Sequence, residues 1–499
     1  MSASGETGSC GLPAAGLNSS GSLRACVLGL CLAAVYAAVL IDFRKTFPEH
    51  VLFGMTFNSM LLHMLHGRFD VDAAAVGGEG YRRGASVYAY FGPFCAFVRL
   101  PFMAFVDLRQ TDLTVPSMLL ATLVAAVCKW RCVVTVRSAA PPSPMRDALT
   151  SRLLLVLLLA GAQIQFLRPS IYQEVLSWSN AEASGFILLA CVGLFRLKRF
   201  PSWLMAGMAA LAGVALLTRV TTGLGLYTGV GCLLLRNVVV AGRAAGWRRS
   251  LLSRSTWSVA GILLMFAGAA AVVNANRWGN PLTFINLDLY VGNPAFPERV
   301  AREHRYGEFN LLRLPFGLLY YFVPIWFFPN GSGGLIFGDF QQRLIDSAEF
   351  PPASFLLSDS LLVILGFLGV RRLPGRHVPV RQQGERASPG LDRGAATILL
   401  GGFIVAPVLL LTAISMAFRY RVEFYPLLEF SALIGTFLWC HGERRSVPRW
   451  PAIACDISIL AALVLLFAYR QTELNPITEP WGAHHLHCPT LFCGVPHAF

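Results

Sequence analysis

The fold of this chain is limited most by a succession of long apolar segments that alternate with short basic ones. A helix that spans a bilayer needs about 20 predominantly apolar residues. Hydrophobic residues make up 55% of the chain and charged residues 14%, so a soluble fold would leave too much apolar surface in water. The sequence predicts an all-α polytopic membrane protein with about eleven transmembrane helices, at 24–42, 113–129, 152–167, 183–196, 202–218, 222–240, 256–275, 355–370, 396–416, 424–440 and 452–469.

Basic loops between these segments predict the orientation. Loops rich in Lys and Arg fall on one side of the membrane if the N-terminus is cytoplasmic, as the positive-inside rule requires. Topology therefore accounts for the net charge of +14, and we exclude nucleic acid as a partner. The basic loops are 129–152, 196–201, 241–256, 371–395 and 441–451.

This orientation divides the chain into three parts. We expect a disordered cytoplasmic N-terminus at 1–23, a single membrane domain at 24–469 and an extracytoplasmic tail at 470–499. Long outer loops are expected at 43–112 and 276–354, and most acidic residues lie on this outer side. Chemistry, if present, is expected on the outer face.

The apolar run at 315–328 does not fit this alternation. It is shorter than a span needs, and counting it as one would move every later basic loop to the outside. Its aromatic residues prefer the headgroup level. We interpret it as an interfacial or re-entrant segment, and a short true span is the alternative.

The first outer loop combines interfacial helices with acidic residues. Apolar helical patterns at 51–66 and 94–105 predict two helices that lie in the membrane interface. Between them, Asp70 and Asp72 share one face of an extended segment, so both carboxylates could address one cation or one sugar. Ordinary solvated loop charges are the alternative.

Asp42 closes the first span. A carboxylate at a membrane boundary is costly unless it is used or paired. It could accept a proton from an incoming hydroxyl or hold a metal, and pairing with Arg44 or Lys45 is the alternative.

The stretch Tyr88-Ala89-Tyr90-Phe91-Gly92-Pro93 resembles a tyrosine–phenylalanine–glycine–proline signature of uncharacterised bacterial GT-C glycosyltransferases. The whole topology also resembles that superfamily, and most closely its bacterial polyprenyl-phosphate-sugar transferases, such as Rgt-type, arabinosyl and mannosyl enzymes. The resemblance implies inversion at the anomeric carbon, with Asp42 as the general base and Asp70 or Asp72 as a second acidic position. Tyr88 and Tyr90 would contact a sugar or lie at the lipid interface.

Arginines near the outer membrane surface are candidates for holding a lipid phosphate, because the leaving group gathers negative charge. Arg219 ends one span, and Arg419 and Arg421 flank a tyrosine in an outer turn. Anchoring by snorkelling arginine is the alternative. In the predicted outer loop 168–182, Glu174 could line the cavity in which the substrate binds, with interfacial packing as the alternative.

The sequence thus predicts an inverting glycosyltransferase at the outer leaflet of a bacterial plasma membrane. It would move a sugar from a polyprenyl-phosphate donor to an extracytoplasmic glycan or lipid acceptor, with membrane lipids as further partners. No cofactor is certain, and the sequence leaves open whether a divalent cation (Mg or Mn) is required. A transporter or lipid flippase would place ionisable residues at mid-span, whereas here Glu429 and Asp359 are the notable cases. A non-catalytic membrane protein of the same fold is the third reading.

Overall fold

The computed structural model describes residues 51–140, 144–161, 170–295, 297–323, 344–345, 347–348, 354–373 and 391–442, with five single positions between 453 and 461. Several predicted segments fall outside the described residues. These are 1–23, the first span at 24–42 with Asp42, most of the last span at 452–469, and the tail at 470–499.

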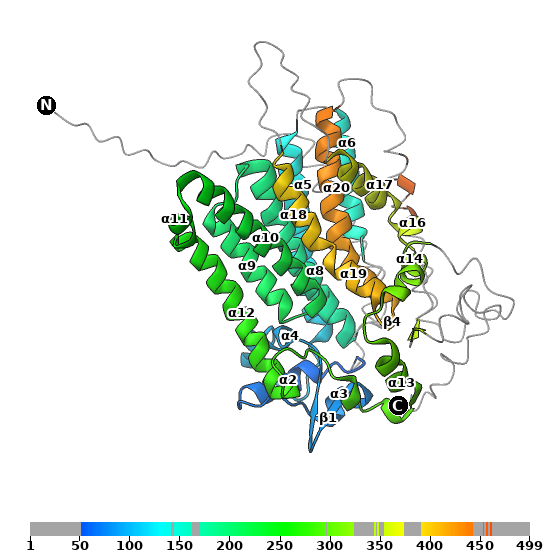
Figure 1. The fold of residues 1–499 in the computed structure, drawn as a ribbon. Coiled ribbons are helices and arrows are strands. Elements are labelled where there is room, and N and C mark those ends of the chain that lie inside the picture. The colour runs from blue at the N-terminus through cyan, green and yellow to red at the C-terminus, as the bar shows by residue number, and fades with distance from the viewer. Residues whose placement is uncertain are drawn as a thin grey trace, which may run out of the picture.

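Long apolar helices lie side by side and form the main body of the molecule (Figure 1). Helices α5 and α8, α9 and α10, α9 and α12, and α17 and α20 are the principal packed pairs. The long helices are α5 (Thr114–Ala139), α6 (Pro144–Leu159), α8 (Ile171–Cys191), α9 (Ser202–Leu216), α10 (Val220–Ala245), α12 (Arg254–Trp278), α17 (Ser360–Arg372), α18 (Arg393–Phe403) and α20 (Tyr425–Gly442). Shorter elements of the bundle are η3 (Val192–Leu197), α11 (Trp247–Leu251), α16 (Phe355–Ser358), α19 (Val405–Thr412) and η8 (Phe418–Phe424).

Five helical stretches among the described residues are long and apolar enough to cross a bilayer. They carry leucines that point away from the bundle, such as Leu123, Leu235 and Leu264, which are 62–66% exposed. Exposed leucines are unfavourable in water but favourable in contact with lipid chains. The chain is therefore a multi-pass membrane protein. The five stretches are Thr114–Ala139, Ile171–Leu197, Val220–Ala244, Arg254–Trp278 and Arg393–Thr412. The total of eleven spans stays a prediction.

Small residues allow close helix packing, as expected inside a membrane. A Cβ on Gly369 of α17 would lie 2.7 Å from the Ser431 carbonyl oxygen and 2.9 Å from the Gly435 nitrogen, both on α20. The two backbones therefore approach each other closely only because glycine occupies both sides of the contact.

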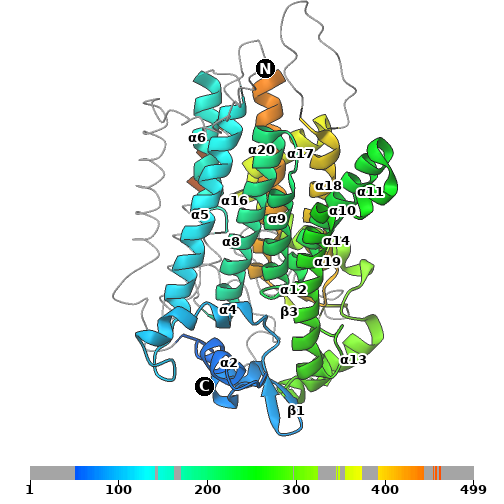
Figure 2. The ribbon, with the colours of Figure 1, turned by 90° about the vertical axis from the view of Figure 1, so that its left-hand side faces the viewer.

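A cap covers one end of the bundle in both views (Figures 1 and 2). Its own hydrophobic core contains Phe57, Val87 and Phe91 and continues onto the first turns of α5 and α8. The cap consists of α2 (Thr56–Met64), α3 (Ala73–Val76), η1 (Gly77–Glu79), β1 (Tyr81–Arg83), β2 (Ser86–Tyr88), α4 (Phe94–Phe97) and η2 (Leu100–Ala104). Strands β1 and β2 form an antiparallel hairpin that pairs Tyr81 with Tyr88. The two predicted interfacial helices correspond to α2 and to α4 with η2.

The segment after α12 runs across the same end of the molecule as the cap. It contains η4 (Leu287–Leu289), η5 (Asn293–Ala295), α13 (Pro297–Tyr306), η6 (Leu311–Arg313) and α14 (Leu314–Phe322). Tyr290 forms a bridge with Tyr81, which joins this segment to the cap hairpin. Strands β3 (Ser347–Ala348) and β4 (Ser415–Met416) pair in parallel. Helix α14 has nine residues, and positions 324–328 of the predicted apolar run lie outside the described residues, so its interpretation as interfacial or re-entrant stays a prediction.

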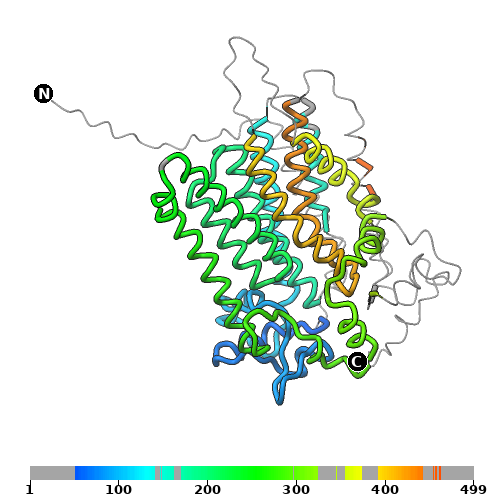
Figure 3. Tube along the Cα trace, viewed as in Figure 1, coloured from blue at the N-terminus to red at the C-terminus, as the bar shows by residue number. Residues whose placement is uncertain are grey.

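Three predicted boundaries are wrong. Helix α8 begins at Ile171, so most of the predicted outer loop 168–182 is helical. Helix α5 continues to Ala139 instead of ending at 129, and α6 begins at Pro144 instead of 152. In contrast, the C-terminal ends of α5, α10 and α17, which carry arginines in their last turns, lie together at the end of the bundle opposite the cap, as the alternation predicts (Figure 3). Which compartment each end faces stays a prediction.

Candidate functional site

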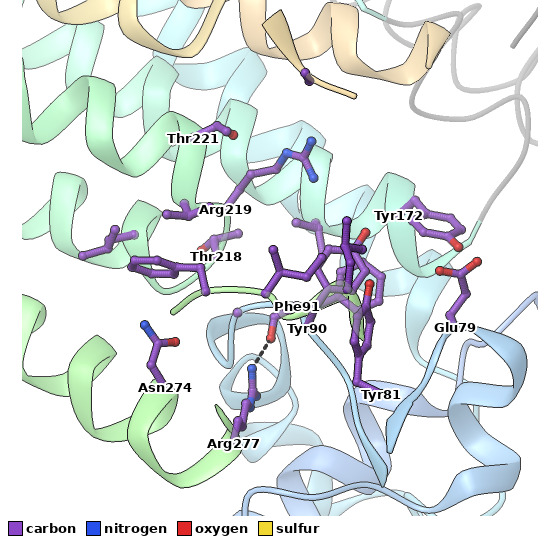
Figure 4. Close-up of a pocket in the computed structure, with 18 of the residues that line it drawn as sticks. Glu79, Tyr81, Tyr90, Phe91, Tyr172, Thr218, Arg219, Thr221, Asn274 and Arg277 are labelled. Carbon is purple, nitrogen blue, oxygen red and sulfur yellow. Dashed lines mark hydrogen bonds between the residues drawn. The ribbon is translucent and has the colours of Figure 1, made fainter. Parts of the chain in front are cut away.

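A cavity of about 330 Å³ lies where the cap meets the bundle (Figure 4). Its walls come from the cap hairpin, the first turn of α8, the α9–α10 turn, the end of α12, α13 and the turn before α20. Four arginines and one carboxylate line it, beside tyrosines and aliphatic side chains. The charged lining residues are Glu79, Arg219, Arg277, Arg299 and Arg419.

The motif Phe91-Gly92-Pro93 fixes the cap against the bundle at this cavity. The Phe94 backbone nitrogen donates a hydrogen bond of 3.0 Å to the Leu217 carbonyl oxygen. A Cβ on Gly92 would overlap the same Leu217 carbonyl. Glycine is therefore needed for this close approach, which places the cap beside the turn that carries Arg219.

Arg219 enters the cavity from the turn between α9 and α10. Its guanidinium pairs with the fully buried carboxylate of Glu423, which also accepts a hydrogen bond from the Thr221 hydroxyl. The guanidinium carbon lies 5.1 Å from the Tyr420 ring centre, within reach of a cation–π interaction. The ion pair with Glu423 thus fixes the orientation of the Arg219 guanidinium.

Arg419 contacts two aromatic rings at the same wall. Its guanidinium carbon is 4.4 Å from the ring centre of Tyr172 and 5.5 Å from that of Tyr420. Both distances are within reach of a cation–π interaction, so the two rings help to position the side chain at the cavity.

Glu79 is the one carboxylate among the described residues that line the cavity. It ends the glycine-rich turn η1, in which Gly77 has a φ of +53°, a conformation that favours glycine. A Cβ on Gly80 would lie 2.6 Å from Val87, so glycine is also needed after Glu79. The Tyr290 hydroxyl donates to Glu79 at 3.3 Å. In Figure 4 the carboxylate points toward the Tyr172 hydroxyl.

Tyrosines surround Glu79 on the cap side. Tyr81 packs against Tyr290, Tyr90 and Trp278, with ring centres 5.4–5.8 Å apart. Burial raises the pKa of Tyr81 well above its usual value, and burial also raises the pKa of Tyr290. Both hydroxyls therefore stay protonated and can act as donors.

The predicted aromatic pair divides between two environments. Tyr90 lines the cavity, whereas Tyr88 is absent from its lining and contacts Trp278 with ring centres 6.1 Å apart.

Glu174 does not reach the cavity. It is fully buried in a bidentate ion pair with Arg99, with nitrogen–oxygen distances of 2.6 and 2.8 Å. Arg99 also donates to the Asn58 side-chain oxygen at 2.8 Å, and Asn58 in turn donates to the Leu108 carbonyl. This network joins the cap to α8, so the geometry assigns Glu174 to structure, contrary to the predicted substrate contact.

Arg421 is separated from Arg419 although the two residues flank Tyr420. Its side chain is fully buried and pairs with Asp359 at 2.6 Å, while Tyr425 also donates to Asp359 at 3.2 Å. Arg421 does not line the cavity. Of the predicted phosphate-binding arginines, the structure brings Arg219 and Arg419 together and leaves Arg421 out.

Asp70 and Asp72 lie in the cap away from the cavity lining. Both contact the ring of His63, at 3.0 and 3.3 Å, and Arg68 pairs with Asp70 at 2.7 Å. Arg68 and then His63 lower the pKa of Asp70 to about 2. These contacts favour a structural role for the pair, and the predicted catalytic role has no support from their position. Asp42, outside the described residues, stays a prediction.

The described residues around the cavity do not form a metal site. They contain no group of three or more His, Cys, Asp or Glu side chains placed to hold an ion. One carboxylate, Glu79, is too few ligands for Mg²⁺ or Mn²⁺ without a contribution from elsewhere in the chain.

No protein-family model matches the sequence, and no curated protein matches it. Among solved structures, the chain is similar to the oligosaccharyltransferase of Archaeoglobus fulgidus in its apo form, at 11% identity and a TM-score of 0.40. The match covers 89% of this chain and 56% of that enzyme, so the chain spans about half of its length. It is also similar to ArnT from Cupriavidus metallidurans bound to undecaprenyl phosphate, at 15% identity and a TM-score of 0.39. That match covers 90% of this chain and 77% of ArnT.

At these TM-scores the similarity determines neither substrate nor catalytic residues, which have to come from the cavity itself.

Sequence reasoning missed Glu79, Arg277 and Arg299 as residues of the cavity. For Glu79 a signal was available, because glycines at 77, 78 and 80 surround it and indicate a tight turn that projects one side chain. For Arg277 and Arg299 the sequence offers no comparable signal, because their position depends on the packing of α12 and α13 against the cap.

Proposed function

We propose that this chain is a membrane glycosyltransferase. It transfers a sugar from a polyprenyl-phosphate donor to a glycan or lipid acceptor, and the cavity between cap and bundle is the place of reaction. One observation supports this proposal above all: arginines, a single carboxylate and an apolar wall meet in one cavity at the end of a membrane bundle.

The arginines suit a lipid phosphate. Four of the five charged lining residues are arginines, and Glu423 neutralises one of them, Arg219. The remaining positive charge still exceeds that of Glu79, so an anion is favoured over a cation or a neutral solute. Arg419 and Arg219 enter from the same wall, and Tyr420 contacts both guanidinium groups. Hydrogen bonds from guanidinium to phosphate are among the stronger ones in proteins. They would also stabilise the charge that builds up on the leaving phosphate.

The aliphatic wall suits a polyprenyl chain. Leu216 and Val220 from the α9–α10 turn face the cavity, as do Ala270 and Val273 from α12. A lipid whose phosphate lies at Arg419 can keep its first isoprene units against these side chains, with the tail leaving between helices toward the bilayer.

A carboxylate is needed to activate the acceptor. In the proposed reaction the acceptor oxygen forms a bond to the anomeric carbon while the bond from that carbon to the phosphate oxygen breaks. The hydroxyl proton passes to a carboxylate as attack proceeds. Glu79 is the candidate base among the described lining residues, and Asp42 is the candidate from the sequence resemblance.

The transporter alternative finds less support. The ionisable residues noted within spans are engaged: Glu429 pairs with Lys129 at 2.6 Å, and Asp359 pairs with Arg421. Neither pair lines the cavity. We further propose a bacterial plasma membrane as the location, with the cavity facing outward and the basic helix ends facing the cytoplasm.

The experiment is transfer from a polyprenyl-phosphate sugar in membranes of cells that lack the native copy, with Glu79→Gln and Asp42→Asn assayed separately. Loss of the general base lowers turnover by about 10²–10⁴-fold, so one of the two variants should show this loss. Glu308→Gln is the matched control, because Glu308 lies between α13 and η6 but does not line the cavity. Normal turnover in both variants would contradict the proposal.

A lipid-binding experiment provides a second test of the proposed function. Purified protein should bind undecaprenyl phosphate and should not bind undecaprenol, which has the same chain without the phosphate. Equal affinity for the two lipids would show that the arginines do not recognise a phosphate.

A further inference from the structure

Arg277 stands apart from the other arginines of the cavity. It belongs to the last turn of α12 and lines the cavity, yet its side chain is only 2% exposed. One terminal nitrogen donates to the Phe91 carbonyl at 2.7 Å, and the other lies 3.4 Å from the Met60 sulfur. The Nε atom has no hydrogen-bond partner. No described carboxylate pairs with it.

A buried guanidinium without an anion is costly. Two other strongly buried arginines have a carboxylate within ion-pair distance: Arg99 has Glu174 and Arg421 has Asp359. Buried Arg313 instead donates to four backbone carbonyls, whereas Arg277 donates to one. The carbonyl end of α12 offsets part of the charge of Arg277, and the Phe91 carbonyl satisfies one donor. A charge that is desolvated and not neutralised points to an anion that arrives with a ligand.

The surroundings place this charge away from the proposed phosphate site. Figure 4 shows Arg277 and Arg219 on opposite sides of Phe91 and Tyr90. Asn274, one turn earlier on α12, faces the cavity beside Arg277, and its amide nitrogen is held by the Pro281 carbonyl at 3.1 Å. The amide oxygen is thereby fixed at the edge of the same region.

We propose that Arg277 forms a second anion-binding subsite, distinct from that of Arg219 and Arg419, which takes an oxyanion of the substrates. This inference rests on the proposed function. The oxyanion is a phosphate or carboxylate group with two possible sources. It is either a second phosphate on the lipid donor or an acidic group on the acceptor, and both would bind by the same charge-assisted hydrogen bonds.

The test compares binding of three probes to the full-length protein in detergent micelles: undecaprenyl monophosphate, undecaprenyl diphosphate and inorganic phosphate. If Arg277 holds a second donor phosphate, the wild type binds the diphosphate about tenfold or more tightly than the monophosphate. Arg277→Gln then removes this preference without changing monophosphate affinity.

If the acceptor supplies the oxyanion, the two lipids bind equally. In that case wild-type protein saturated with the monophosphate still binds inorganic phosphate, and Arg277→Gln abolishes this binding. Arg83→Gln is the matched control, because Arg83 contacts the backbone carbonyls of Asn276 and Arg277 but does not line the cavity.

The inference is overturned if wild-type protein shows neither a diphosphate preference nor phosphate binding beside the monophosphate. This result needs no variant, so it holds even if Arg277→Gln fails to fold. It is also overturned if Arg277→Gln weakens monophosphate binding as much as Arg419→Gln does, since a single phosphate site would then contain both arginines. Failure of the wild type to bind the monophosphate at all would instead contradict the proposed function.

Discussion

The junction between cap and α8 and the cavity beside it contain the same kinds of residue in opposite states. At the junction, Arg99 and Glu174 are fully buried and neutralise each other through two hydrogen bonds. In the cavity, Arg277 and Glu79 pair with no described residue of opposite charge. Burial alone therefore does not separate structural from functional charges. What separates these two groups is whether the protein itself supplies the counter-charge. Arg219 is intermediate, because it lines the cavity and is also paired with Glu423.

The comparison predicts different consequences of substitution. A residue whose partner is built into the fold should affect stability when it is removed, because its partner is left buried and unpaired. A residue whose counter-charge would come with a ligand should affect binding or turnover more than stability, because its removal leaves no buried charge unpaired. Each experiment below tests one side of this division.

The largest expected effect is on the stability that the buried ion pair of Arg99 and Glu174 provides. Arg99→Ala should lower the free energy of unfolding by about 3–5 kcal/mol, because Glu174 would remain buried without a partner. Thermal unfolding in detergent micelles, with Arg109→Ala as an exposed cap control, measures this. The double replacement Arg99→Met with Glu174→Leu should recover much of the loss. If the double variant were no more stable than Arg99→Ala, neutralisation would not be the reason for the pair.

The next effect compares two arginines that are two residues apart. Arg419→Gln should weaken undecaprenyl phosphate binding by about tenfold or more, since charge-assisted hydrogen bonds contribute roughly 1.5–3 kcal/mol. Arg421→Gln should leave the affinity of the folded protein unchanged and should lower its melting temperature, because Asp359 loses its partner. Titration of both purified variants with the lipid decides between them. A reversed result would place the phosphate at Arg421.

The smallest effect concerns Asp70, whose pKa of about 2 in the folded protein lies below the usual 3.8. A lowered carboxyl pKa stabilises the folded state above the unfolded pKa, and this contribution disappears as pH falls from about 4 toward 2. Asp70→Asn should therefore be slightly less stable than the wild type at pH 7. The difference should shrink as pH falls through this window, as thermal unfolding at several pH values can measure. A gap that widened toward low pH would contradict the assignment.

Sequence reasoning succeeded where the deciding property is local. Hydropathy predicts the apolar helices α9, α10 and α12 with nearly their observed bounds. The motif ending in Gly92 and Pro93 is recognisable in the sequence, although its contact with Leu217 is visible only in the structure. Prediction failed for the first half of α8. Polar residues such as Glu174 and Glu182 made that segment resemble a loop, although each has a partner from elsewhere in the chain: Arg99 for Glu174 and Thr218 for Glu182.

What the sequence by itself determined is which segments are apolar enough to lie in a bilayer. It also predicts the side of the membrane for each basic loop, and that orientation stays a prediction. Hydropathy and charge add up along a stretch of chain and need no knowledge of its neighbours. What only the tertiary structure decided is which charges meet. Lys129 and Glu429 are 300 positions apart and pair at 2.6 Å, whereas Arg419 and Arg421 are two positions apart and face different surroundings. Electrostatic interaction depends on distance in space and on burial, and neither follows from distance along the chain.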